Sequence, residues 1–365
     1  MKPDPAWVDL PLRPELRDAR PYGAPQMDLR VRLNVNENPY PPPEDVRRDM
    51  VEAVRRAAYE INRYPDREAL DLRMKLADYL GYGLSLDQVW AANGSNEAMV
   101  QILQAFAGPG RSVMTFTPSY SMYPEYTRDT HTAYLTESRA PDFHIDLDAA
   151  LRAIETQSPD VIVIATPNNP TGTITGLDVI ETILDRAPGM VVVDEAYQEF
   201  SSSPSALELL SGYGQLIVSR TMSKAFAFAG GRVGYVAAAP SVVDALRVVR
   251  LPYHLSGITQ AVACAALDHA DEMLAQVGHL VDLRDRGMAT LRSMGMDVVD
   301  SGSNFFLFGP FKNRHAAWQA LVDRGVLVRE TGPEPYLRTC VGTDEEMEIF
   351  YQKVAEVWTM ERNEQ

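Results

Sequence analysis

The 365-residue sequence has little cysteine and no long apolar stretch. Its two cysteines, Cys264 and Cys340, are too few for a disulfide-stabilised scaffold and lack the CxxC spacing of redox and zinc sites. We therefore expect two buried thiols in a reducing compartment. No window approaches the roughly 18 consecutive apolar residues of a membrane-spanning helix, and the first residues include prolines and acids where a secretory signal is apolar. The sequence predicts a cytoplasmic protein.

Basic residues are also scarce, with 34 Lys and Arg against 50 Asp and Glu and a formal net charge of −16. Nucleic acids and anionic membranes attract proteins with an excess of Lys and Arg. We therefore expect neither as a partner, and an anionic ligand has to meet a local group of arginines. The six histidines lack metal-ligand spacing, and the sequence has no GxGxxG, P-loop, GxSxG or HExxH motif. These absences argue against nicotinamide, ATP and zinc chemistry, and we expect no metal site.

What is present is an average globular composition, 45% hydrophobic and 23% charged, in a chain long enough for two domains. Residues 1–44 are rich in Pro, Arg and Asn and predict an extended N-terminal arm, because dense proline prevents helix. Residues 45–245 alternate helix-period segments with short apolar runs, which is typical of a mostly parallel sheet covered by helices. Residues 246–365 predict a smaller α+β domain, joined by the arm. The expected fold class is α/β.

The individual elements follow from the same periodicities. In the larger part we expect helices over 45–60, 67–80, 96–106, 146–156 and 177–186, and strands at 89–92, 112–116, 161–165, 190–193 and 216–219. In the smaller part we expect long helices over 257–296, a strand at 305–308, a helix over 313–324, strands at 326–329 and 336–341, and a last helix with Asp344 as its N-cap.

Polar groups follow three consecutive apolar runs. They are residues 168–172 (Asn-Asn-Pro-Thr-Gly), 194–197 (Asp-Glu-Ala-Tyr) and 219–224 (Ser-Arg-Thr-Met-Ser-Lys). Taken singly, they fit a turn, a helix cap and a solvated lysine. The carboxyl ends of parallel strands share one edge of a sheet, and ligands bind beyond that edge. Together the three segments therefore predict one site with an amide, a carboxylate and an amine, the amine being Lys224.

These motifs carry a family resemblance that runs essentially end to end. Residues 169–172, 194–197 and 223–232 resemble the pyridoxal 5'-phosphate (PLP) dependent aminotransferases of fold type I. Within that group, residues 33–40 (LNVNENPY), 63–66 (RYPD) and 93–97 (NGSNE) resemble histidinol-phosphate aminotransferases. Residues 21–25 (PYGAP) and 251–256 (LPYHLS) are similar to the actinobacterial branch.

The resemblance implies PLP as cofactor and four catalytic residues. PLP needs an amine for a Schiff base, and a partly desolvated lysine near cations has a lowered pKa, so Lys224 is expected to hold PLP and then to act as general base. Asp194 is expected to keep the pyridine nitrogen protonated, so that the ring accepts electrons. By resemblance, Asn169 and Tyr197 donate hydrogen bonds to the phenolate oxygen of the ring, and Tyr120 stacks on its face.

The cofactor phosphate requires amide groups and cations. Ser95 and Asn96 lie where a helix is expected to begin, which supplies free backbone N–H groups and the positive end of a helix dipole. Ser223 and Arg232 add a hydroxyl and a charge. By resemblance, Tyr64 reaches the phosphate in the neighbouring subunit, so that a homodimer is needed for catalysis.

The substrate side also requires cations. The resemblance assigns Arg338 to the carboxylate of the amino acceptor, and Arg329 as a second cation for the phosphate of histidinol phosphate. Two arginines nine residues apart on neighbouring strands can bind one anion. The resemblance also places Tyr22, Asn36 and Tyr253 among the substrate-binding residues, with Tyr22, Asn96, Tyr120 and Tyr253 on the imidazole side.

The activity implied by the resemblance is transamination of L-histidinol phosphate with 2-oxoglutarate to imidazole-acetol phosphate and L-glutamate, a step of histidine biosynthesis. Two alternatives stay open on these residues. An aromatic amino acid aminotransferase would use the same site, and a PLP-dependent lyase of the threonine-phosphate decarboxylase type would share Lys224, Asp194 and the arginine pair. The acidic charge disfavours a PLP-domain transcription regulator.

Overall fold

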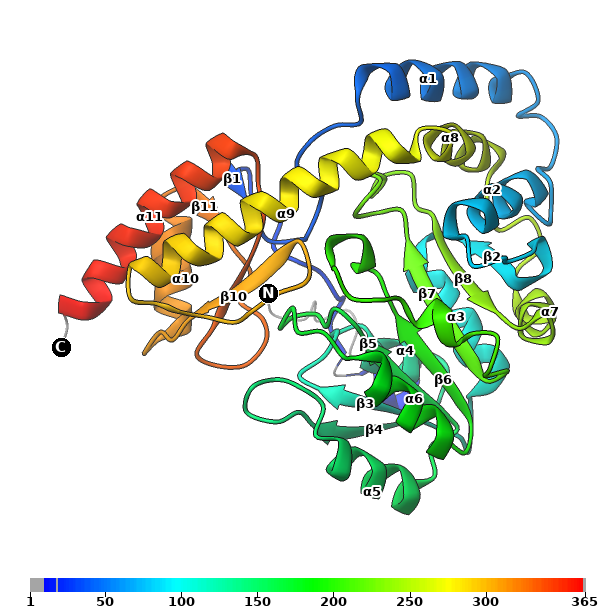
Figure 1. Ribbon diagram of the computed structural model, residues 1–365, viewed down its shortest axis with the longest axis horizontal. Coiled ribbons are helices and arrows are strands. Elements are labelled where there is room, and N and C mark those ends of the chain that lie inside the picture. Colours follow the sequence, from blue (N-terminus) through cyan, green and yellow to red (C-terminus); the bar gives the residue numbers. More distant parts are fainter. Residues whose placement is uncertain (1–9, 18, 364–365) are drawn as a thin grey trace.

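A computed structural model of the chain describes residues 10–17 and 19–363. Its centre is a seven-stranded sheet in which every neighbouring pair is parallel except those that involve β8 (Figure 1). The order across the sheet is β2 (Val89–Ala92), β8 (Gly234–Ala238), β7 (Leu216–Thr221), β6 (Met190–Asp194), β5 (Val161–Ala165), β3 (Ser112–Thr117) and β4 (Ala133–Ser138). The expected mostly parallel sheet is confirmed.

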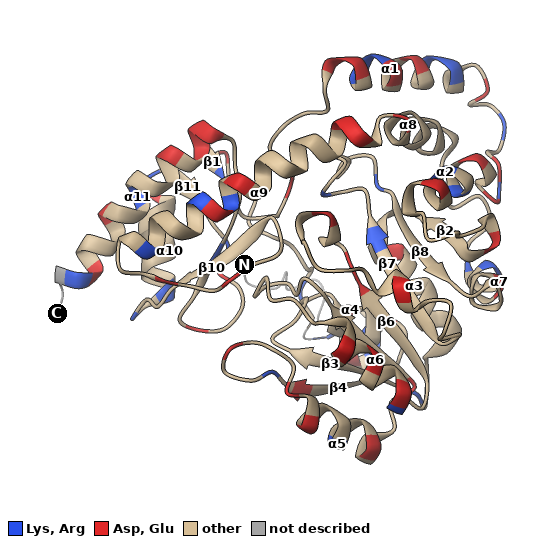
Figure 2. Cartoon of the chain, viewed as in Figure 1, with Lys and Arg blue, Asp and Glu red and all other residues tan. Residues whose placement is uncertain are grey.

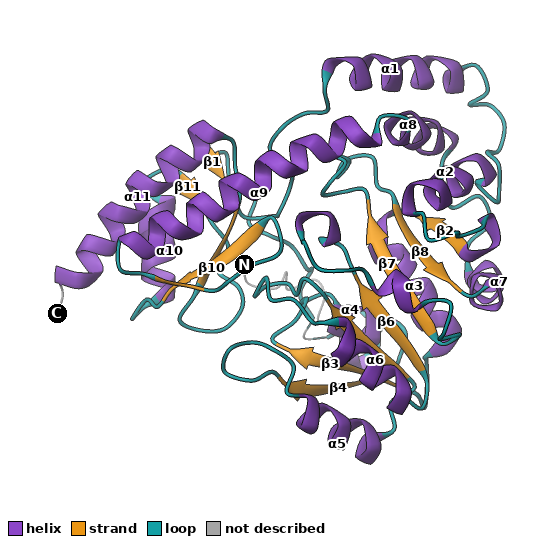
Figure 3. Ribbon diagram, in the orientation of Figure 1, coloured by secondary structure: helices purple, strands orange, loops and turns teal. Residues whose placement is uncertain are grey.

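Helices cover both faces of this sheet, because alternate residues of each inner strand point to opposite sides. Val161 and Val163 join one apolar cluster, whereas Ile162 and Ile164 join the other. The first cluster contains residues of α3 (Gly94–Phe106), α4 (Tyr123–Asp129) and α7 (Pro240–Val249), and the second contains residues of α2 (Leu70–Leu80), α5 (Leu147–Gln157) and α6 (Leu177–Arg186). The sheet is therefore the middle layer of three (Figure 3).

A second group of elements lies beside the main sheet. It consists of a two-stranded and a three-stranded sheet with the helices that flank them. In the two-stranded sheet, β1 (Val31–Arg32) pairs with β11 (Val326–Leu327). In the three-stranded sheet, the strand order is β12 (Leu337–Cys340), β10 (Phe305–Gly309) and β9 (Asp297–Val298). The helices are α9 (Ala270–Ser293), α10 (Arg314–Val322) and α11 (Asp344–Asn363). The N-terminal arm thus pairs with a late strand, while the domain limits at residues 44 and 245 stay predictions.

Helices α1 (Glu44–Ala58) and α8 (Gly257–Leu267) pack against each other at the far end of the molecule from α11 (Figure 1). Short 3₁₀ turns lie at Pro14–Leu16, Leu86–Gln88, Gln198–Phe200 and Ala206–Leu209. None of the helices among residues 10–17 and 19–363 is long and apolar enough to cross a membrane. Figure 2 shows most charged residues on the helices, and on the five inner strands charge is limited to Asp194 of β6 and Arg220 of β7.

The helices expected over 257–296 are present as α8 and α9, which are separated at Asp268 and His269. Two other local expectations differ from the structure. Asp344 is the first helical residue instead of the N-cap, because Thr343 takes that position: its Oγ1 accepts from the Glu346 N–H at 3.3 Å, and the Glu346 carboxylate accepts from the Thr343 N–H at 2.8 Å. Of the two thiols expected to be buried, Cys264 is partly exposed.

Candidate active site

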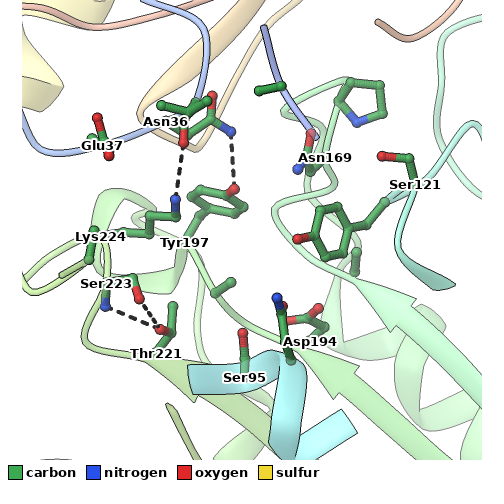
Figure 4. Close-up of a pocket in the computed structure, with 18 of the residues that line it drawn as sticks. Asn36, Glu37, Ser95, Ser121, Asn169, Asp194, Tyr197, Thr221, Ser223 and Lys224 are labelled. Atoms are coloured by element: carbon green, nitrogen blue, oxygen red, sulfur yellow. Dashed lines mark hydrogen bonds between the residues drawn. The ribbon is translucent and has the colours of Figure 1, made fainter. Parts of the chain in front are cut away.

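A cavity of about 420 Å³ lies at the carboxyl ends of β5, β6 and β7 (Figure 4). Ala165 is the register partner of Asp194, which in turn is the partner of Ser219. The expected convergence of three strand ends is therefore present. The other parts of the lining come from the N-terminal arm, the start of α3, the segment 119–123 after β3 and the segment around β12. The predicted site residues in the lining are Tyr22, Asn36, Ser95, Asn96, Tyr120, Asn169, Asp194, Tyr197, Ser223, Lys224, Arg232, Arg329 and Arg338.

Lys224 lies on the loop that follows β7 and extends its amine into the cavity (Figure 4). Its Nζ donates to the carbonyl of Val35 at 3.3 Å. Burial, followed by the nearby positive charge of Arg338, lowers the pKa of Lys224 to about 8. A substantial fraction of the amine is therefore neutral near pH 8, which is the form that reacts with a carbonyl group.

Asp194 ends β6 and is buried. Its Oδ2 accepts a hydrogen bond from the Tyr123 hydroxyl at 2.8 Å, whereas its Oδ1 is buried and accepts none from any residue that the structure describes. Burial raises the pKa of Asp194 to about 6. A buried carboxylate oxygen without a hydrogen-bond donor lowers the stability of the protein. A protonated ring nitrogen would supply the missing donor.

Tyr197 and Asn169 carry further hydrogen-bonding groups into the cavity. The Asn36 amide donates from Nδ2 to the Tyr197 oxygen at 3.0 Å, so the hydroxyl hydrogen of Tyr197 stays available to another acceptor. The Asn169 oxygen accepts from the Arg338 guanidinium at 2.6 Å. Burial raises the pKa of Tyr197 to about 12, which keeps the phenol protonated.

The N-terminus of α3 forms a cradle for an anion. Gly94 has φ +79°, and a Cβ there would lie 2.4 Å from Nη2 of Arg232. Gly234 of β8 approaches so closely that a Cβ would lie 2.0 Å from the backbone nitrogen of Ser95. Both glycines are therefore needed for this contact between helix, strand and arginine. Free N–H groups at a helix start, beside an arginine, bind phosphate well.

Arg329 and Arg338 form a backbone pair, because each N–H donates to the other's carbonyl, at 2.9 and 3.0 Å. Arg338 is buried and also donates to the Asn34 carbonyl at 3.0 Å. Within the described residues, Nε of Arg338 and Nη1 of Arg329 are buried without an acceptor. Two unsatisfied guanidinium donors in one cavity favour an anionic group of the substrate.

Tyr64 and Tyr253 are the two predicted site residues that do not line the cavity. They stack on each other with ring centroids 4.4 Å apart and an interplanar angle of 17°. Tyr64 is 80% exposed and Tyr253 is 41% exposed. Within a single chain, these rings therefore lie on the surface.

Sequence reasoning missed Tyr123 and Tyr126. Besides the bond from Tyr123 to Asp194, the Tyr126 hydroxyl donates to Oδ1 of Asn96 at 2.8 Å. The available signal was the three-residue spacing of Tyr120, Tyr123 and Tyr126, which aligns side chains on one side of a helix.

Comparison with known proteins agrees with this geometry. The model of the family "Aminotransferase class I and II" matches residues 30–354. The chain belongs to this family. The histidinol-phosphate aminotransferase of Thermobifida fusca is 56% identical over 94% of each chain, and that of Corynebacterium efficiens is 52% identical over 98% of this chain and 97% of the relative. A solved histidinol-phosphate aminotransferase from Sinorhizobium meliloti, in complex with PLP, has a TM-score of 0.85 and 25% identity, and the match covers 96% of this chain and 98% of that one.

The class I and II aminotransferases use PLP, and the cavity fits it. The unpartnered Oδ1 of Asp194 matches a protonated pyridine nitrogen, and Lys224 is an amine with a lowered pKa. The start of α3 with Arg232 matches a phosphate. When bound, PLP supplies an electron-withdrawing ring that stabilises negative charge on the carbon attached to the amino group.

Proposed function

We propose that this aminotransferase transfers the amino group of L-histidinol phosphate to 2-oxoglutarate, giving imidazole-acetol phosphate and L-glutamate, as a step of histidine biosynthesis. The observation that carries the choice of substrate is the pair Arg329 and Arg338. Both residues line the cavity that contains Lys224, and among the described residues each has a buried guanidinium nitrogen without a partner. One anion-binding place can serve the phosphate of one substrate and the carboxylate of the other in turn. Relatives with more than half of their residues identical carry this activity in their names.

Residues of the cavity have proposed roles in holding the cofactor or moving a proton. Lys224 Nζ would hold the cofactor and, once released, would act as the base of a 1,3-proton shift. It would take the proton from the substrate carbon that bears the amino group and deliver it to the cofactor carbon to which the lysine had been joined, because its pKa of about 8 lets it exchange protons near neutral pH. Asp194 binds the ring nitrogen, and Asn169 and Tyr197 bind the ring oxygen. Tyr120 stacks on the ring. Ser95, Asn96, Ser223 and Arg232 bind its phosphate.

Substrate positioning is assigned to residues at the mouth and the arginine side of the cavity. Arg329 and Arg338 bind the anionic end of each substrate. Tyr22 lies over the cavity, with its hydroxyl 3.1 Å from the Ser121 hydroxyl. Asn36 belongs to the same wall. Phenol and amide groups there can pair with imidazole nitrogens.

We further propose a cytoplasmic homodimer in which Tyr64 reaches the phosphate in the partner's site and Tyr253 lines the partner's substrate pocket. Their exposure on one chain supports this proposal, since rings that stack in solvent gain burial when a second chain covers them. Further exposed apolar side chains flank them along the sequence: Val51, Tyr59, Ile61, Val248 and Leu251.

The substrate is tested by adding histidinol phosphate to the PLP-loaded enzyme and following the cofactor absorption band in a single turnover. We expect conversion at a low concentration of histidinol phosphate, with phenylalanine requiring far more. The reverse order would make the chain an aromatic amino acid aminotransferase. Release of carbon dioxide from a phosphorylated amino acid would make it a lyase.

The crossing of Tyr64 is tested by mixing two impaired variants, Lys224→Ala and Tyr64→Ala. In a mixed dimer, one of the two sites has an intact Lys224 and receives an intact Tyr64 from the other chain. We expect the mixture to recover up to about a quarter of the wild-type activity, because about half of the dimers are mixed. Absence of recovery, with subunit exchange shown by mass spectrometry, would contradict the crossing.

A further inference from the structure

We propose that Tyr123 is a positioning residue that holds Asp194 and Tyr120 together in the orientation that the cofactor ring requires. The inference rests on the proposed role of Asp194. Tyr123 also lines the cavity, but its hydroxyl is bonded to Asp194 and its ring packs on Tyr120, so we infer that it acts through these two residues.

The hydrogen bond to Asp194 fixes the direction of the carboxylate. Tyr123 is the first residue of α4 and is 2% exposed, and its hydroxyl donates to Oδ2 at 2.8 Å. The two oxygens of a carboxylate share a plane, so a bond to one of them restricts the rotation that places the other. The oxygen left over, Oδ1, is the buried one without a partner. Tyr123 therefore directs the free oxygen of Asp194 to the ring nitrogen.

The same bond favours the ionised form of Asp194. Burial raises the pKa of Asp194, and the Tyr123 hydrogen bond acts in the opposite direction. Besides burial, the pKa of Asp194 is lowered by the Tyr123 hydroxyl and the Ala196 backbone and raised by Glu195, and the charge of Asp194 in turn raises the pKa of Tyr120, Tyr126 and Tyr197. Burial raises the pKa of each tyrosine, and the negative charge of Glu195 raises that of Asp194. Within this group, the Tyr123 hydroxyl is the donor bonded to the carboxylate.

The ring of Tyr123 has a second contact. Tyr120 meets it edge to face, with centroids 5.6 Å apart and an angle of 89°, and Tyr126 packs on it with centroids 6.5 Å apart. Tyr120 lines the cavity, and Tyr126 binds Asn96 at the start of α3. The middle ring thus joins the residue proposed to stack on the cofactor to the carboxylate proposed to bind its nitrogen.

The test compares Tyr123→Phe with the matched control Tyr134→Phe. Phenylalanine keeps the ring contacts and removes the hydroxyl. Tyr134 loses a hydroxyl contact of 2.8 Å to Thr115, on the edge strand and outside the cavity. We expect Tyr123→Phe to weaken PLP binding by about tenfold, and to lower kcat by tenfold to a hundredfold while KM changes less than about threefold, since the lost bond is to a charged group. Tyr134→Phe should do neither.

A double-mutant cycle on PLP affinity separates this inference from a general packing effect. In the Asp194→Asn background, Tyr123→Phe should change PLP affinity less than about threefold, because the carboxylate that the hydroxyl stabilises is gone. An equal loss in both backgrounds would overturn the inference, as would a Tyr123→Phe enzyme that matches the control. A wild-type protein that binds no PLP would instead overturn the proposed function itself.

Discussion

The amine of Lys224 donates to the carbonyl of Val35, a residue of the N-terminal arm, across 3.3 Å. The neighbouring arm carbonyls are held in the same way. Arg338 donates to Asn34 at 3.0 Å, and Asn304 donates to Asn36 at 3.1 Å. Three consecutive carbonyls of the arm are thus bound by side chains from three distant segments, so the arm forms a wall of the cavity whose position depends on the site residues themselves.

The lowered pKa of Lys224 gives a pH dependence for cofactor uptake. The neutral amine is the nucleophile, and its fraction rises as the pH rises through the folded-state pKa of about 8. We expect the rate of PLP incorporation into the apoprotein to increase from pH 6 to 9 with a midpoint near 8, followed by absorbance in stopped flow. Lys224→Ala should give no covalent band at any pH. A midpoint near the usual lysine value of 10.5 would contradict the assigned environment.

Removal of Arg338 should weaken both substrates. Loss of a guanidinium that binds a charged group reduces affinity by about tenfold to a hundredfold. For Arg338→Ala we therefore expect KM values for histidinol phosphate and 2-oxoglutarate to rise together by that factor in steady-state assays. Arg324→Ala removes an arginine that binds Glu356 outside the cavity and serves as the control. A rise for one substrate alone would mean two separate anion sites.

Substitution at Gly94 should reduce PLP affinity. An alanine there has to adopt φ +79° and places its Cβ against Nη2 of Arg232. We expect Gly94→Ala to bind PLP about tenfold more weakly in fluorescence titrations, because a left-handed backbone alone costs an L-residue about 1–2 kcal/mol. Gly214→Ala is the matched control, since no heavy atom lies within 4 Å of its Cβ position and its φ lies outside the left-handed region. Equal affinities for the two variants would show that the cradle does not depend on this glycine.

The buried pair of Glu195 and Arg220 predicts a large stability effect. The Arg220 guanidinium donates to Oε2 of Glu195 at 2.8 and 3.0 Å, and both side chains are buried. Glu195→Gln removes the nearer of two buried carboxylates from Arg220 and leaves Glu199 at 3.7 Å, so the free energy of unfolding should fall by up to about 3–5 kcal/mol in urea titrations. Glu52→Gln breaks an exposed pair with Arg55 and should cost at most about 0.5 kcal/mol. A loss as small as that of the control would mean that Glu199 or solvent compensates the charge of Arg220.

Asn36→Ala should reveal how Tyr197 is held. The Asn36 amide occupies one lone pair of the Tyr197 oxygen and leaves the hydroxyl hydrogen for the cofactor. Without it, we expect the tyrosine hydroxyl to reorient and kcat to fall by about tenfold, in line with one buried hydrogen bond. The pH titration of the bound cofactor's absorption band should shift in the same variant. An unchanged titration would leave Asn36 as a wall residue without influence on Tyr197.

The sequence predicted the main sheet well, for a physical reason. Strands such as 161–165 are buried on both faces and read as continuous apolar runs, and their carboxyl ends had to meet. The convergence of Asn169, Asp194 and Lys224 follows from that rule. By contrast, β4 and β8 were not predicted. β4 (Ala133–Ser138) is an edge strand with mixed polar and apolar residues, and β8 (Gly234–Ala238) is rich in small residues.

Other parts of the site depend on contacts that no local pattern encodes. The positions of Tyr22, Asn36 and Arg338 were expected from family resemblance alone, since tertiary pairing brings the arm to the cavity. The sequence pattern did not indicate Tyr123, because its proposed role depends on a hydrogen bond to Asp194, which is far away in the sequence. Tyr64 and Tyr253 are exposed in a single chain, whereas their proposed role requires a second chain that covers them.

The pairing of β1 with β11 has a consequence for biosynthesis on the ribosome. Leu33 accepts a hydrogen bond from the N–H of Cys340, and Val31 is the register partner of Val326. At about 5–20 residues per second, the roughly 300 residues between these partners take about 15–60 s to translate. During that interval the emerging arm has no strand to pair with, although the inner strands of the main sheet are complete once residue 238 has been made. Strand β1 is therefore made first and stays unpaired for the longest time, so it is the strand that chaperones of nascent chains are expected to bind.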